Sequence, residues 1–207
     1  MTAKKNQAIR KKGLKKIYQN LPESLQKYFC HFSKLIDDDL IDVLISYLFS
    51  QVELAHNNTV YGSVVRVHLV HSDIAKNVVQ TSYMTREHFR RLYKNITGKS
   101  ISKEAIDKIM KAEKIRDRIL HGKHVKSADK REAIQLTLEY SKLLNEQVYN
   151  DAEFKPFGTM KGFNGRGKFQ SKKSTSRLIL IGMGLLSDKN TEKNTKNKEK
   201  LINGTEF

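Results

Sequence analysis

The chain has 207 residues and a formal charge of +17, so it is long enough for one ordinary domain with extensions and basic enough to indicate a polyanionic partner. Nucleic acid fits that charge better than an anionic membrane surface does. The single cysteine, Cys30, excludes an intrachain disulfide, and its aromatic neighbours predict a buried side chain. No apolar stretch follows the basic N-terminus, and polar residues interrupt the most apolar run, residues 40–55. We therefore expect neither a secretory signal nor a membrane span, and a soluble, cytoplasmic protein.

Two segments carry most of the excess charge. Residues 1–20 hold seven lysines and arginines without an acid, and residues 154–187 hold another seven, which leaves +3 for the remaining chain. This distribution indicates a nearly balanced folded part with two basic flanks that meet the polyanion. Because residues 1–20 have no sustained apolar stripe, we expect a solvated tail there that forms a weak helix only on contact with a partner.

Apolar residues recur at helical spacing through most of the chain. The pattern predicts helices over about residues 22–36, 39–56, 64–80, 85–95, 103–121 and 128–150. The second of these is apolar on almost every side, which indicates a central helix. Residues 60–70 are rich in β-branched side chains, but no other good strand lies nearby, so we favour a helix that begins near residue 64. The predicted fold is an all-α antiparallel helical bundle.

Three polar residues gather at the predicted end of the helix over residues 103–121. Asp117 and His121 are four apart and share a helix face, whereas Arg116 and His121 lie about 140° apart around an ideal helix. Gly122 stands where a left-handed residue commonly ends a helix. Arg116 and His121 can therefore meet on one ligand only if the helix loosens at this end or if a second chain contributes.

The pattern Arg116-Asp117-x-x-x-His121 resembles the Arg-polar-x-x-x-His motif of the HEPN superfamily of small α-helical proteins. The following Gly122-Lys123 and the long helix opening near Ser127 resemble the segment that comes after the motif in that family. The resemblance covers roughly residues 38–150. It implies a HEPN-like bundle and a metal-independent endoribonuclease without a cofactor, of the kind that acts as a toxin, a phage-defence effector or an RNA processor. It also implies a homodimer with the motif at the interface.

The resemblance assigns catalysis to Arg116, Asp117 and His121. His121 would move protons, Arg116 would hold the phosphate and stabilise its extra charge, and Asp117 would orient one of the two. Lys123 and His124, just beyond the helix, would contact RNA. Two alternatives to a catalytic protein stay open. In the first, the chain is a basic RNA-binding module whose motif residues only cap and pair at the helix end. In the second, it is a HEPN partner of a nucleotidyltransferase antitoxin.

Glycine, basic and aromatic residues interleave after residue 153. Glycines let the backbone approach a phosphate, bases neutralise it and phenylalanines can stack on nucleobases, so this segment is a candidate RNA contact. The alternative is a basic loop whose phenylalanines pack on the bundle. Residues 178–186 are apolar, and we expect a helical turn or two docked on the bundle. The predicted RNA-binding residues here are Lys161, Arg166, Lys168, Lys172 and Lys173.

The chain thus divides into four parts. We predict a basic extension over residues 1–20, a HEPN-like bundle over 21–150, a basic glycine- and aromatic-rich segment over 151–187, and a disordered tail over 188–207. A metal site is not predicted, because His68 and His71 are three apart but lack a clear third ligand.

Overall fold

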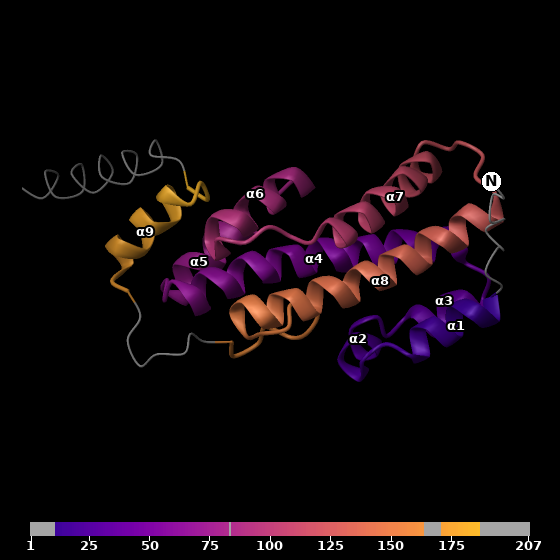
Figure 1. The fold of residues 1–207 in the computed structure, drawn as a ribbon, viewed down its shortest axis with the longest axis horizontal. Coiled ribbons are helices and arrows are strands. Elements are labelled where there is room, and N and C mark those ends of the chain that lie inside the picture. Colours follow the sequence, from indigo (N-terminus) through magenta and orange to yellow (C-terminus); the bar gives the residue numbers. More distant parts are fainter. Residues whose placement is uncertain (1–10, 83, 164–170, 187–207) are drawn as a thin grey trace, which may run out of the picture. The chain divides into compact units, whose positions relative to one another are not determined.

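A computed structural model describes residues 11–82, 84–163 and 171–186 (Figure 1). Within these ranges every regular element is a helix, which confirms the all-α prediction. The chain forms two compact units. Residues up to Thr59 join Ser100–Lys161 in the first unit, and Val60–Lys99 join the described residues from Gly162 onward in the second. The predicted RNA-binding residues Arg166 and Lys168 and the tail over 188–207 lie outside the described residues.

The first unit is built around long helices. It contains α1 (Lys11–Gln19), α2 (Glu23–Tyr28), α3 (Phe32–Asp37), the first part of α4 (Ile41–Val67), α7 (Lys103–Leu120) and α8 (Ser127–Ala152). The second unit contains the end of α4, α5 (Ser72–Thr81), α6 (Arg86–Thr97) and α9 (Lys173–Gly182). No helix in the described ranges combines the length and the apolar character that crossing a membrane requires.

Helices α7 and α8 pack side by side and antiparallel (Figure 1). Two ion pairs bridge them, Lys108 Nζ to Glu139 Oε2 at 2.7 Å and Lys111 Nζ to Glu132 Oε1 at 2.6 Å. The inner face of α8 carries residues that are completely buried, among them Ala133, Ile134, Leu138, Leu144 and Val148. Burying each larger one stabilises the fold by about 1.5–3 kcal/mol. The predicted helix pair around residues 121–127 is therefore confirmed.

Helix α4 is longer than predicted. The predicted end near residue 56 does not occur. The helix continues through Asn58, whose side chain donates to the carbonyl of Pro156 at 3.0 Å and so has a partner from another segment of the chain. The β-branched run after it is helical as well, with Val60, Val64 and Val65 buried. The following helix consequently begins at Ser72, later than the sequence predicts.

The prediction of one helix over residues 22–36 is wrong, since a turn around Phe29 separates α2 from α3. This turn lets Phe29 and Phe32 both be fully buried. It also leaves Cys30 exposed, against the prediction of a buried thiol. Aromatic neighbours in sequence thus pack inward while the cysteine between them faces outward.

Residues 11–19 are not a solvated tail. They form α1, which packs against α8 and buries Leu14 completely. One turn later, the ring of Tyr18 stacks on Phe32 with centroids 4.4 Å apart. Leu14 and Tyr18 are four apart and therefore make a short apolar stripe. This stripe is sufficient to pack α1 into the fold because α8 supplies the opposite surface.

In the second unit α5 packs against α9. The hydroxyl of Ser176 on α9 accepts from the backbone N–H of His71 at 3.0 Å, and Leu180 is fully buried. The predicted apolar helical turn is therefore present, in a helix that begins earlier, at Lys173. Of the phenylalanines in the basic segment, Phe154 and Phe157 are buried in the first unit, which supports the packing alternative for those two.

Candidate functional site

The motif helix α7 has defined caps at both ends. Ser102 begins it by accepting a hydrogen bond from the N–H of Ala105 at 3.3 Å. At the other end Gly122 adopts φ +66°, its N–H donates to the carbonyl of Ile119 at 3.0 Å, and the next N–H donates to the carbonyl of Arg118 at 2.9 Å. These two bonds form a Schellman motif, which fixes the end of the helix and confirms the predicted role of Gly122.

Arg116 is held against α4. Its side chain is 24% exposed, its Nη1 lies 3.3 Å from Oδ1 of Asp117, and its Nη2 lies 3.8 Å from Oε1 of Glu53. The guanidinium carbon is 5.3 Å from the ring centroid of Phe49, a cation–π distance. Among the described residues its buried Nε has no hydrogen-bond partner. Two carboxylates and one ring therefore orient the guanidinium.

Sequence reasoning did not place Glu53 or Phe49 in the site. The two residues are four apart on α4 and face Arg116 together. One signal was available, because Glu53 is the only Asp, Glu, Lys or Arg between positions 43 and 65, a stretch that is otherwise uncharged apart from His56. A lone charge in such a helix indicates a specific partner, although nothing in the sequence identifies that partner as Arg116.

His121 is the C-cap residue that directly follows α7, and it is exposed. Its backbone N–H donates to the carbonyl of Asp117 at 3.0 Å, while its imidazole makes no hydrogen bond or ion pair within the described ranges. No such contact joins it to Arg116 there either. The structure thus brings Arg116 and Asp117 together and leaves the imidazole of His121 available to a ligand or a second chain.

The predicted RNA-contact residues fall in different places. Lys123 and His124 are exposed in the loop after His121, and the carbonyl of His124 accepts from Arg118 Nη2 at 3.0 Å. Lys161 is exposed at the end of the first unit. Lys172 and Lys173 are exposed at the start of α9 and belong to the second unit. Only the first two therefore share a local segment with the motif.

The two histidines considered as metal ligands both have other partners. His68 Nε2 lies 2.7 Å from the carbonyl of Ile96, and the His71 ring nitrogen Nδ1 accepts from the N–H of Asp73 at 3.3 Å as the cap of α5. Among the residues that the structure describes, no group of three or more His, Cys, Asp or Glu side chains is placed to hold a metal ion.

Comparisons of the chain with protein-family models, with curated proteins and with solved structures found no match.

Proposed function

We propose that the protein is an endoribonuclease of the HEPN type that cleaves RNA without a metal ion. The observation that carries this proposal is the combination at one helix end of an arginine oriented by Glu53, Asp117 and Phe49 with an exposed imidazole at His121. An oriented guanidinium suits a phosphate, and an accessible imidazole suits proton transfer near neutral pH.

The chemistry follows from these two groups. The imidazole of His121 takes the proton of a ribose 2′-hydroxyl, and that oxygen forms a bond to the adjacent phosphorus. The bond from phosphorus to the 5′ oxygen breaks, and the departing oxygen takes up a proton from water. The His121 imidazolium returns its proton to the hydroxide that remains. The products are a 2′,3′-cyclic phosphate and a 5′-hydroxyl. Arg116 stabilises the extra negative charge on the phosphate while the bonds exchange, because a planar guanidinium can bind two phosphate oxygens at once.

A homodimer is part of this proposal. Since Arg116 is turned toward α4 and His121 is exposed, one chain has difficulty bringing both to one phosphate. A two-fold interface would place a partner's copy of the motif opposite, because such an interface uses the same patch twice. Apolar side chains near the motif support this arrangement: Met110, on the same face of α7 as Asp117, is 42% exposed, and Leu120 is 55% exposed.

The second candidate is a basic RNA-binding protein without catalysis. One observation favours it, namely that both terminal nitrogens of Arg116 already lie near carboxylates. A phosphate would have to displace Glu53, whose oxygen is at 3.8 Å, or bind beside it. In this case the motif would only shape the end of α7, and RNA would bind the exposed bases.

One assay separates the two candidates. Purified protein is incubated with a labelled single-stranded RNA in the presence of excess chelator, beside His121→Ala and the control His31→Ala, an exposed histidine outside the motif. We expect cleavage with cyclic phosphate ends for the wild type and the control and none for His121→Ala. Melting of His121→Ala should stay close to that of the wild type, because an exposed residue at a helix end contributes little to stability. Cleavage that stops with chelator and survives His121→Ala would overturn the mechanism.

A further inference from the structure

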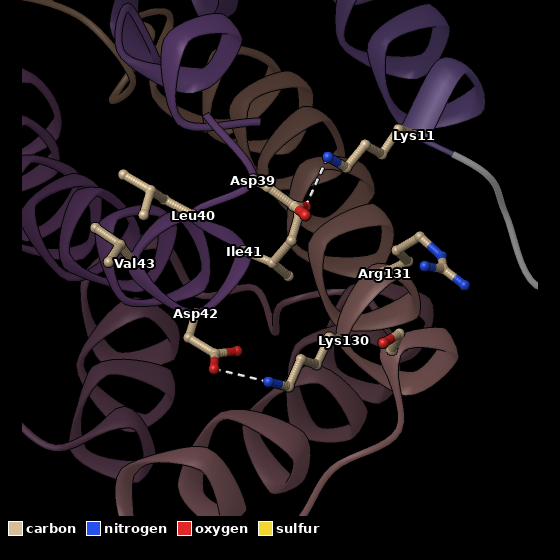
Figure 2. Close-up of a pocket in the computed structure, with 9 residues that line it drawn as sticks. Lys11, Asp39, Leu40, Ile41, Asp42, Val43, Lys130 and Arg131 are labelled. Atoms are coloured by element: carbon tan, nitrogen blue, oxygen red, sulfur yellow. Dashed lines mark hydrogen bonds and ion pairs between the residues drawn. The ribbon is translucent and has the colours of Figure 1, made fainter. Parts of the chain in front are cut away.

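A pocket of about 480 Å³ lies in the first unit, and none of the motif residues Arg116, Asp117 and His121 lines it (Figure 2). It is lined by Lys11 of α1, by residues 39–43 at the start of α4, and by Ser127, Lys130 and Arg131 at the start of α8. Its volume falls within the range of about 300–1,000 Å³ that is common for ligand sites. Ser127 follows His121 by six residues, so their Cα atoms are at most about 22 Å apart. The pocket and the motif end of α7 are therefore close enough for one short strand of nucleic acid to reach both.

Two of the three cations in the wall are already paired. Lys11 Nζ lies 2.7 Å from Oδ1 of Asp39, and Lys130 Nζ lies 2.7 Å from Oδ2 of Asp42 (Figure 2). Within each pair the positive and the negative charge neutralise each other. The lining thus has three positive and two negative charges, and the surplus belongs to the third cation, Arg131.

Arg131 has no ion pair or hydrogen bond from its guanidinium within the described ranges, and its Nε is buried without a partner. A buried N–H without an acceptor is destabilising, and a bound anion would supply the missing acceptor. Arginine binds phosphate oxygens through two parallel N–H groups, which makes phosphate the anion that suits it best.

Leu40 and Val43 are about half exposed, but Figure 2 shows both on the opposite side of the start of α4 from Arg131, so they do not face an anion bound by Arg131.

We propose that this pocket binds one nucleotide of a single-stranded RNA through its phosphate, which Arg131 holds. The inference deepens the proposed ribonuclease function and rests on it, because the nucleotide would belong to the same strand that is cleaved at the motif. Arg131 then contributes affinity and the position of the strand, and takes no part in the bond exchange.

The test measures RNA binding in full-length chains that carry His121→Ala, so that the probe is not cleaved. A fluorescent single-stranded RNA of mixed sequence is titrated against this form, with and without Arg131→Gln. The matched control is Arg91→Gln, which removes the same charge from an exposed position on α6. We expect Arg131→Gln to weaken binding about tenfold and to reduce the slope of log affinity against log salt by about 0.7, and Arg91→Gln to change affinity less than twofold.

Arg131→Lys is the second variant, and it keeps the charge but loses the two-nitrogen fork. We expect an affinity between those of the wild type and Arg131→Gln. Equal binding by Arg131→Gln and Arg91→Gln, or no RNA binding by the parent chain, would overturn the proposal. Inorganic phosphate is the other probe. If it raises the melting temperature in an Arg131-dependent way while RNA binding is unaffected by the substitution, the site takes free phosphate and the RNA proposal is wrong.

The outcome also separates this proposal from the proposed function. If the wild type cleaves RNA and the two glutamine variants bind RNA equally, the ribonuclease proposal is supported and the proposal of an RNA-binding pocket is wrong. Loss of binding in Arg131→Gln together with no cleavage by the wild type would leave an RNA-binding pocket on a protein that is not a nuclease.

Discussion

Arg116 Nη2 lies 3.8 Å from Glu53 Oε1, so the motif arginine on α7 is oriented by an acid on α4 that lies outside the motif. If the proposed mechanism holds, Glu53 is a positioning residue for Arg116. We expect Glu53→Gln to lower the rate of RNA cleavage about tenfold, less than Arg116→Ala, because Asp117 and Phe49 still hold the guanidinium. Single-turnover cleavage with excess protein measures this rate.

The control for Glu53→Gln is Glu146→Gln, which removes an exposed acid from α8. It should leave the rate unchanged. If Glu53→Gln behaves like that control, Glu53 does not act through Arg116. If it behaves like Arg116→Ala, Glu53 contributes to the reaction more directly than the geometry indicates.

A composite site across a dimer predicts complementation between two inactive chains. Arg116→Ala and His121→Ala should each be inactive alone, but a mixed dimer would retain one site with an intact arginine from one chain and an intact histidine from the other. Random exchange of equal amounts should therefore restore about a quarter of the wild-type activity. The measurement is RNA cleavage after mixing, with subunit exchange followed by fluorescence transfer between labelled chains. Exchange without recovered activity would show that each chain needs both of its own residues.

A buried hydrogen bond gives a test of stability that does not depend on function. His56 Nε2 and the Tyr140 hydroxyl are 2.6 Å apart, and both residues are almost completely buried. Tyr140→Phe keeps the ring and removes this bond, so we expect the free energy of unfolding to fall by about 1–3 kcal/mol. Chemical denaturation with urea measures the change. The exposed Tyr149→Phe should differ from the wild type by less than about 0.5 kcal/mol, and a similar loss in both variants would contradict the assignment.

Alkaline pH should destabilise the first unit. Burial raises the pKa of the Tyr47 hydroxyl to about 12, and the hydrogen bond with Glu139 raises the pKa of the Lys108 ammonium above its ordinary value. In both cases the unfolded chain loses its proton at a lower pH than the folded chain does. These two groups therefore make their full contribution to stability below about pH 10. The free energy of unfolding then falls as the pH rises from about 10 to 12.

Thermal melting at about pH 8 and about pH 11 tests this direction. Tyr47→Phe removes one of the responsible groups, so its melting temperature should fall less between the two conditions than that of the wild type. Tyr149→Phe, on an exposed position, should follow the wild type. An equal fall in the Tyr47→Phe and wild-type proteins would mean that Tyr47 does not contribute to the alkaline loss.

The sequence predicted the motif helix and its partner well because their determinants are local. Ser102, Gly122 and the apolar spacing of α8 act within a few residues of where they stand. The failures involve contacts between distant segments. Neither the helical state of Asn58 nor the packing of Leu14 can be read from neighbouring residues, since the first depends on Pro156 and the second on α8. Glu53 and Phe49 are missing from the predicted site for the same reason, because they lie on α4 and contact the motif residue Arg116 only in the folded chain.

The arrangement of the first unit also bears on how the chain is made. Helix α1 and the first part of α4 belong to it, but α8, against which α1 packs, follows α1 in the sequence by roughly one hundred residues. At a synthesis rate of about 5–20 residues per second, the N-terminal helices wait on the order of 5–20 seconds for that surface to leave the ribosome. During this interval α1, which carries Leu14, lacks the surface of α8 against which it packs. Nascent chains of this protein are therefore expected to need a chaperone that binds apolar segments until α8 is complete.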